Sequence, residues 1–324
     1  MMKGKRLLAT LLIILLIYLQ INIFAVAKES KNYFIVNGTG DGNCKSIQEA
    51  LDNAPQDSTI YVKIGVYNEI LNIRTRVKLL GEDKDKTVIN PISKENKYAI
   101  CLGAPGVMIS NLNITNGASG LYATAVQVSA PETEISNCII HDTSIGVAIW
   151  TSDNLVENCV FTGCSDEGIA LLGSKYSKCD NNKITNCTFY NNCDGIELQY
   201  SSNNIISYCK FYENSHIGID AIASSNDGNT ILSCEIYNNT VSGLYLASSS
   251  DNKITNCFIS NNRDGNVVIT KNSYNNDIKN SEPDTTYQEA QKDNSLIKRI
   301  FNRISDIKNN IGIFSLIFKE KYKF

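Results

Sequence analysis

The sequence predicts an all-β fold, a single-stranded right-handed parallel β-helix with three short strands per coil and about ten coils. Three features support this prediction. An Asn-Cys-x-Ile/Phe step recurs along the chain, a short strand beginning with Gly follows each step, and a loop rich in Ser and Asn ends each period. Tandem units of this kind bury their apolar side chains only by stacking on one another.

The recurring step sets the period of the repeat. Leu112 and Cys257 lie six steps apart, so the mean period is about 24 residues. The aligned segments are residues 109–114, 135–140, 156–161, 184–189, 206–211, 231–236 and 254–259. Stacked at the interstrand spacing of about 4.8 Å, equivalent residues of successive coils would form columns along the axis.

Within one period, the pattern predicts two inward-facing strands that meet at a short turn. Asn directly before the Cys position suits the turn, because Asn tolerates the left-handed backbone region. The Cys position and the apolar residue two places later point into the core. A third strand then begins at a glycine in five of the coils: Gly146, Gly168, Gly195, Gly218 and Gly243.

Most of the eleven cysteines are expected to be core side chains rather than disulfides or metal ligands. Six of them form the repeated column: Cys138, Cys159, Cys187, Cys209, Cys234 and Cys257. Cys164 and Cys193 fall in equivalent turns of adjacent coils and could form a disulfide. The pairing of Cys44, Cys101 and Cys179 stays open.

The ends of the chain depart from the repeat, and the sequence divides into four parts. Residues 1–27 have a positive start, an apolar run and a small-x-small cleavage site, which predicts a signal peptide or, alternatively, an uncleaved membrane anchor. Residues 28–58 form an N-terminal cap with an amphipathic helix at 46–54, and 59–282 form the β-helix. Residues 283–324 are a linker and a basic, amphipathic, helical tail. The protein is therefore expected to be secreted or held at the cell surface.

The N-terminal coils resemble those of pectin-lyase-like proteins, in residues 46–51, 57–69, 78–81 and 86–89. The repeats resemble NosD-type and carbohydrate-binding, sugar-hydrolase β-helix proteins, and the likeness covers about residues 33–282. It implies a polysaccharide or cell-surface glycan as partner. The motifs of polygalacturonases, pectate lyases and pectin methylesterases are missing, so the resemblance transfers no catalytic residue. A net charge of −3 argues against nucleic acid as partner.

The residue two places after each glycine is predicted to point outward, and this column holds the candidate site. Glu197 and Asp220 occupy adjacent coils and are the candidate catalytic carboxylates, with His216 as a further candidate. Carboxylates and aromatics around them would bind substrate: Trp150, Asp166, Glu167, Asp194, Tyr200 and Tyr245. Calcium, the one cofactor considered, could be held by Asp194, Glu197 and Asp220.

Three functions remain open from the sequence. The first is a surface protein that binds glycans along the solenoid without catalysis, which the missing motifs favour. The second is a polysaccharide lyase or glycoside hydrolase that uses the Glu197 and Asp220 pair. The third is a NosD-like accessory for assembly of a copper centre, which the lack of exposed Cys and His clusters disfavours.

Overall fold

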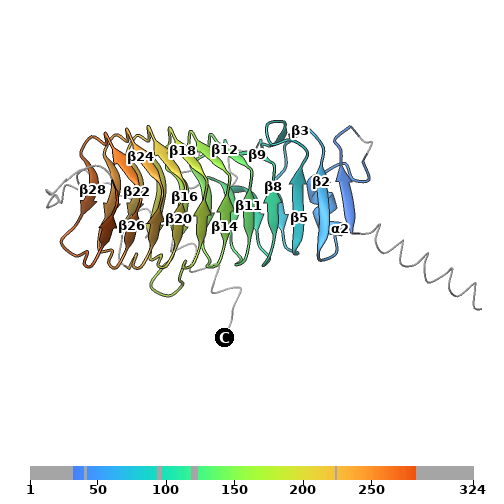
Figure 1. The fold of residues 1–324 in the computed structure, drawn as a ribbon. Helices are drawn as coiled ribbons and strands as arrows, with labels where there is room; N and C mark the ends of the chain where they lie inside the picture. The colour runs from blue at the N-terminus through green and yellow to red at the C-terminus, as the bar shows by residue number, and fades with distance from the viewer. Residues whose placement is uncertain (1–31, 40–41, 93–96, 118–122, 223–224, 282–324) are drawn as a thin grey trace, which may run out of the picture.

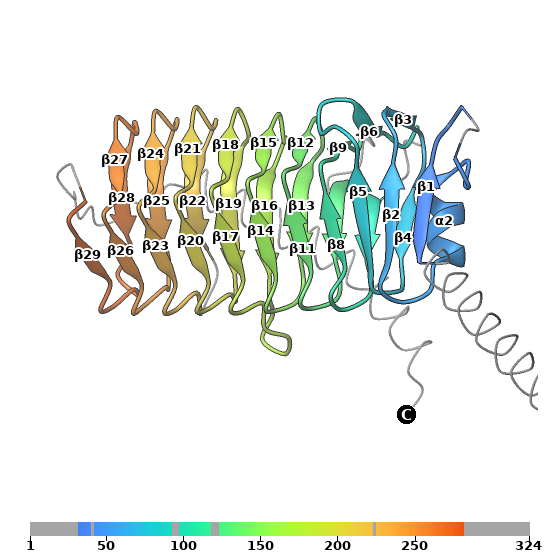
Figure 2. The same cartoon turned by 45° about the vertical axis from the view of Figure 1, so that its right-hand side comes forward.

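The computed structural model describes residues 32–39, 42–92, 97–117, 123–222 and 225–281, which form a long parallel β-helix (Figure 1). All strand pairs are parallel, and each strand pairs with its equivalents in the neighbouring coils. The three strands of each coil contribute to three sheets that run along the axis (Figure 2). The predicted all-β solenoid of about ten coils is confirmed. The predicted signal peptide or anchor and the helical tail lie outside the described residues.

Sheet A has eleven strands: β1 (Tyr33–Val36), β2 (Ser58–Val62), β5 (Val77–Gly81), β8 (Met108–Ser110), β11 (Glu134–Ser136), β14 (Leu155–Glu157), β17 (Lys183–Thr185), β20 (Ile205–Ser207), β23 (Thr230–Leu232), β26 (Lys253–Thr255) and β29 (Asp277–Lys279). Sheet B has nine: β3 (Gly65–Tyr67), β6 (Thr87–Ile89), β9 (Asn113–Thr115), β12 (Ile139–His141), β15 (Val160–Thr162), β18 (Thr188–Tyr190), β21 (Lys210–Tyr212), β24 (Glu235–Tyr237) and β27 (Phe258–Ser260). Sheet C also has nine: β4 (Leu71–Ile73), β7 (Tyr98–Leu102), β10 (Thr124–Val128), β13 (Ile145–Ile149), β16 (Glu167–Leu172), β19 (Asp194–Gln199), β22 (Ile217–Ala221), β25 (Ser242–Leu246) and β28 (Gly265–Ile269).

The turn between sheets A and B has the backbone conformation that its Asn residues predict. Asn137, Asn158 and Asn186 have φ values of 52°, 55° and 52°. In the two coils where Tyr208 or Ser233 replaces Asn, φ is still positive. The stack therefore imposes the turn, and after Gly it is Asn that adopts this conformation at least cost.

The column of six cysteines lies in the core, as predicted, and each of its members is at most 2% exposed. Burial raises the pKa of Cys138 and Cys159 well above the usual thiol value. Phe161, Phe189 and Phe211 stack in the same core with ring centroids 4.7 Å apart. This column is a packing feature.

The disulfide considered between Cys164 and Cys193 is not formed, and all eleven cysteines are thiols. The two residues do lie on neighbouring rungs, since the Cys193 amide donates to the Cys164 carbonyl. Cys164 is buried, whereas Cys193 lies at a partly exposed edge of the coil beside Asp194. The two side chains therefore occupy different environments.

Two asparagine ladders hold the coils in register. In the first ladder, each backbone amide donates to the side-chain oxygen of the Asn in the next coil, over 2.8–3.0 Å: Asn154, Asn182, Asn204, Asn229, Asn252 and Asn276. The second ladder was not foreseen and repeats the pattern through Asn192, Asn214, Asn239 and Asn262. Buried amide groups are thus satisfied by the neighbouring coil.

At the N-terminal end, helix α2 (Ile47–Asn53) packs on the first coil through Ile47, Ala50 and Leu51, as the amphipathic pattern predicts. The Ser46 hydroxyl caps it by accepting from the Glu49 amide. The Glu69 carboxylate accepts from two further amides of its first turn. No helix among the described residues has the length and apolar character needed to cross a membrane.

Candidate functional site

The candidate site lies on the outer face of sheet C, where β16, β19 and β22 lie side by side (Figure 2). In β19, Ile196 and Leu198 point into the main core, so the intervening Glu197 points away from it. The same alternation places Asp220 of β22 on the outer face. Glu197 and Asp220 are direct partners in the register of the two strands, as the sequence predicts.

This outward column is buried from Ala148 to Asp220 rather than exposed to solvent. Glu197 and Asp220 are each 2% exposed, and Ala148 and Ala170 of the same column are equally covered. The two alanines form a small apolar cluster with Ile145 that is separate from the main core. An outward column of ordinary surface residues is therefore excluded here, and the carboxylates lie in a low-dielectric environment.

Asp194 and His216 form a tight pair beside the two carboxylates. Asp194 Oδ1 accepts hydrogen bonds from His216 Nδ1 at 2.7 Å and from the Ile217 amide at 2.8 Å. Asp194 is 1% exposed, and its Oδ2 atom has no hydrogen-bond partner in the part of the chain that the structure describes. A buried carboxylate oxygen left this way costs free energy unless another group occupies the position beside it.

Asp194 belongs to two overlapping groups of possible metal ligands. Glu167, Asp194 and Glu197 each offer one oxygen, and these atoms lie within 4.8 Å of one another. Glu167 takes the place that the sequence-based calcium hypothesis gave to Asp220, because its strand partner is Asp194 itself. Oxygen atoms of this kind are the ligands that calcium prefers. The second group consists of Cys193, Asp194 and His216.

Two residues of the site were not assigned to it from the sequence. Gln199, two places after Glu197 in β19, donates its side-chain amide to Glu197 Oε1. Cys193 was considered only as a disulfide partner, although it precedes Asp194. The His216 amide donates to the Cys193 carbonyl, so the two residues are rung neighbours. Cys193 and His216 each stand two residues before the glycine of their coil, and this shared position in the repeat could have predicted the contact.

The predicted binding residues spread along the face at different distances from the carboxylates. Tyr245 is the strand partner of Asp220 and is partly exposed. Tyr200 follows β19 directly and has a φ of 47°. Trp150, at the end of β13, is 47% exposed and lies two coils from β19. Asp166 accepts from the Asp194 amide through its carbonyl and so lies one rung away.

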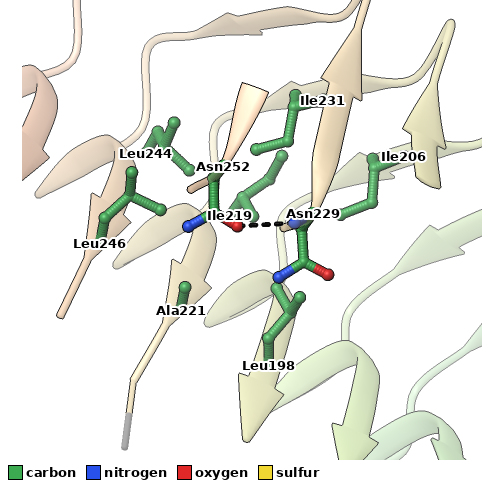
Figure 3. A pocket seen from close by; sticks show the side chains of 9 residues that line it. All are labelled: Leu198, Ile206, Ile219, Ala221, Asn229, Ile231, Leu244, Leu246 and Asn252. Atoms are coloured by element: carbon green, nitrogen blue, oxygen red, sulfur yellow. Dashed lines mark hydrogen bonds between the residues drawn. The ribbon is translucent and has the colours of Figure 1, made fainter. Parts of the chain in front are cut away.

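A space inside the solenoid is no substrate site. Figure 3 shows apolar side chains of sheets A and C converging on it, among them Ile206, Leu198 and Ile219, with Asn229 and Asn252 of the first ladder. The dashed line is the 2.8 Å ladder bond from the Asn229 amide to Asn252 Oδ1. Every residue that lines the space is buried, so it is a small gap in core packing.

Comparisons with known sequences divide the chain into two overlapping parts. The family model for a right-handed β-helix region matches residues 124–282, and the pectinesterase model matches residues 33–169. A pectinesterase from Petunia integrifolia is 33% identical over 143 residues, which are 39% of this chain and 38% of that protein. Probable pectinesterase 56 from Arabidopsis thaliana is 27% identical over 156 residues, 43% of this chain and 54% of the relative. The chain thus spans about a third to a half of these relatives.

Solved structures show the same fold at low sequence identity. The A-module of the mannuronan C-5 epimerase AlgE6 from Azotobacter vinelandii superposes with a TM-score of 0.59 at 15% identity, over 72% of this chain and 70% of that one. A rhamnogalacturonan lyase gives 0.58 at 12% identity, over 81% and 90% of the two chains. Pectate lyase Pel9A gives 0.50 at 17% identity, over 80% and 78%.

The matches cover the candidate site unequally. The pectinesterase match ends at residue 169 and includes Glu167 but not Asp194, Glu197, His216 or Asp220. The β-helix match contains all five. The parallel sheets, the repeat and the matches agree on one assignment. The chain is a right-handed parallel β-helix, and it resembles the pectin-lyase-like proteins that have this fold.

Proposed function

We propose that this protein is an exported enzyme that cleaves a pectin-class polysaccharide on the outer face of sheet C. Glu197 and Asp220 are its acid and base. The pectinesterase matches support a pectin-class substrate. They favour an enzyme over a glycan-binding surface protein without catalysis, and nothing in them supports a copper-assembly role.

The observation that carries the proposal is the register of two buried carboxylates on adjacent strands. Glu197 and Asp220 are direct strand partners and are each 2% exposed. Strands lie about 4.8 Å apart, so two ionised carboxylates here would repel strongly. A pair of carboxyl groups at this spacing can divide into the acid and the base that glycosidic cleavage needs.

The neighbours of the pair assign the roles. Gln199 donates to Glu197, and a donated hydrogen bond favours the ionised form of a carboxylate. Glu197 is therefore the carboxylate that activates water or attacks the sugar, and Asp220 is the acid. Tyr245 lies beside Asp220 and can pack against a sugar ring. Asp194 holds the His216 ring at the edge of the site.

The pectinesterase matches favour methyl-esterified pectin as the first substrate to test. Because the pair is 2% exposed, a polymer reaches it only when this face opens, so binding includes a local rearrangement.

One assay separates the possible chemistries. The full chain is incubated with pectin of high and of low methyl-ester content, and three products are measured: reducing ends, ultraviolet-absorbing unsaturated ends, and methanol. Hydrolysis gives reducing ends without unsaturation. Unsaturated ends would instead show a lyase, and binding without any product would overturn the enzyme proposal.

Ester removal is the second candidate function, and the pectinesterase match over residues 33–169 favours it. Glu197 and Asp220 lie outside that match. Methanol release that persists in Glu197→Gln and Asp220→Asn would therefore place the chemistry in the N-terminal coils and not at this pair.

A further inference from the structure

The edge of the candidate site carries a second set of donor atoms that polysaccharide cleavage does not use. Cys193 and Asp194 are consecutive, and His216 lies on the next rung, bound to Cys193 through a backbone hydrogen bond of 2.9 Å. One sulfur, one nitrogen and one oxygen of these residues lie within 4.8 Å of one another. Cys193 and His216 occupy equivalent positions on adjacent rungs, and the Asp194 carboxylate accepts from the His216 ring, so the three groups converge.

The second observation is the unused oxygen of Asp194. Its Oδ1 atom is engaged by His216 and the Ile217 amide, while Oδ2 is buried and has no hydrogen-bond partner among the described residues. Asp194 itself is 1% exposed. A cation beside Oδ2 would remove the cost of burying this oxygen.

We propose that Cys193, Asp194 and His216 form a zinc site with three protein ligands and one open coordination position. This inference stands independently of the proposed cleavage of polysaccharide. Zinc accepts thiolate, imidazole and carboxylate ligands together in tetrahedral geometry. Calcium takes oxygen ligands and has no use for Cys193 or His216, and the carboxylate makes a poor ligand for copper(I).

The geometry requires little movement for zinc to enter. Zinc lies about 2.0–2.3 Å from such ligands, which places ligand atoms about 3–4 Å apart in a tetrahedron. His216 Nδ1 donates to Asp194 Oδ1 at 2.7 Å, so zinc binding replaces this hydrogen bond: the imidazole releases the proton and the two residues separate by up to about 1 Å, while the sulfur lies within 4.8 Å. Rotation of the Cys193 and His216 side chains can bring the ligand atoms to the distances that zinc requires. Cys193 is partly exposed, so a metal can enter from the edge of the coil.

Cobalt substitution tests the site directly. The full chain, purified and stripped of metal with a chelator, is titrated with Co²⁺, and the thiolate-to-cobalt absorption in the near ultraviolet is recorded. We expect saturation near one cobalt per chain and displacement by Zn²⁺ but not by Ca²⁺. Cys193→Ser should abolish the thiolate band, and His216→Asn should weaken zinc binding by at least about 10–100-fold, the loss that removal of a mere partner of a ligand already causes.

Two controls make the result specific. Cys101→Ser removes the other partly exposed thiol, and Glu197→Gln removes a carboxylate of the neighbouring oxygen group; both should bind cobalt as the wild type does. Thermal unfolding of each variant without metal establishes that it is folded. Unchanged zinc affinity in folded Cys193→Ser, or tight Cu⁺ uptake without Zn²⁺ uptake, would overturn the proposal. Polysaccharide is absent throughout, so loss of the cleavage activity would leave this result intact.

Discussion

The outer faces of sheets B and C are built from the same coils and yet have opposite environments. On sheet B, Tyr190 and Tyr212 stack with ring centroids 5.3 Å apart and remain partly exposed. Lys210 pairs with Glu235 across one rung at 3.0 Å, and both side chains are about half exposed. On sheet C, the equivalent rung-to-rung pair is Glu197 with Asp220, two like charges that are almost fully buried.

The difference shows what each face is built to do. An exposed pair of opposite charges contributes about 0.2–1 kcal/mol, and its loss is tolerated. Two buried acids oppose folding, so a fold retains them only where they are paired, protonated or bound to a ligand. Sheet B therefore presents an ordinary solvated surface, and sheet C is the face to which the proposed chemistry is assigned.

The largest effect is expected from substitutions that break the carboxylate pair itself. Glu197→Gln or Asp220→Asn should lower the rate of pectin cleavage by about 10²–10⁴-fold, because each removes one partner of the acid–base pair. The control is Glu235→Gln, which neutralises a carboxylate on the solvated face and should leave the rate unchanged. Equal rates in all three variants, measured as reducing ends, would move the active centre elsewhere.

A second effect tests how tightly sheet C is packed onto the core. A methyl group added at Gly195 would meet the Gly218 carbonyl oxygen at 2.4 Å and the Phe211 ring at 2.6 Å. Gly195→Ala should therefore lower the free energy of unfolding by about 1–3 kcal/mol, measured by urea denaturation. Gly117→Ala faces open space and should have little effect. If Gly195→Ala left the free energy of unfolding unchanged, the coils would separate more easily than this contact implies.

A third effect concerns the interior of the solenoid and is seen in how the stability of the protein depends on pH. Burial raises the pKa of Cys179 to about 11, whereas a thiol in an unfolded chain titrates near 8.5. The stability it contributes is complete below about pH 8.5 and is lost progressively as pH rises toward 11, because only the unfolded state releases the proton. The urea concentration at the midpoint of unfolding should decrease as the pH is raised from 8 to 10.5. Cys179→Ala should reduce this slope by the share of one thiol, because buried thiols such as Cys138 and Cys159 keep their raised pKa; an identical slope in that variant would contradict the assignment.

The smallest effect concerns the solvated face. Lys210→Met removes the exposed ion pair with Glu235 and should change the free energy of unfolding by less than about 1 kcal/mol. Raising the salt concentration should shrink the difference between variant and wild type further. A loss of several kcal/mol in the same urea experiment would mean that sheet B is not the ordinary surface described above.

Local sequence determines the parts of the fold that could be predicted. The Asn residues before the Cys position mark the left-handed turns, and the alternation in β19 correctly placed Glu197 on the outside. The amphipathic segment beginning at Ser46 predicted α2. Each of these features depends on a few adjacent residues and on a repeated period.

The burial and the contacts of the site could not be predicted in the same way. The burial of Glu197 and Asp220 depends on what packs against the outer face of sheet C, and the period of the repeat gives no information about that. The contact of Cys193 with His216 depends on loop lengths, because unequal loops decide which residues share a rung. Glu167 replaced Asp220 in the oxygen group for the same reason.

The boundary between two coils is the unit on which this site depends. Asp194 with His216, and Glu197 with Asp220, both bridge the coils that contain β19 and β22. A single inserted residue in the connecting segment would misalign both pairs at once, whereas a whole extra coil added elsewhere in the solenoid would leave them unchanged. Duplication of complete coils could thus lengthen the surface around the site, in steps of about 4.8 Å, without altering its chemistry.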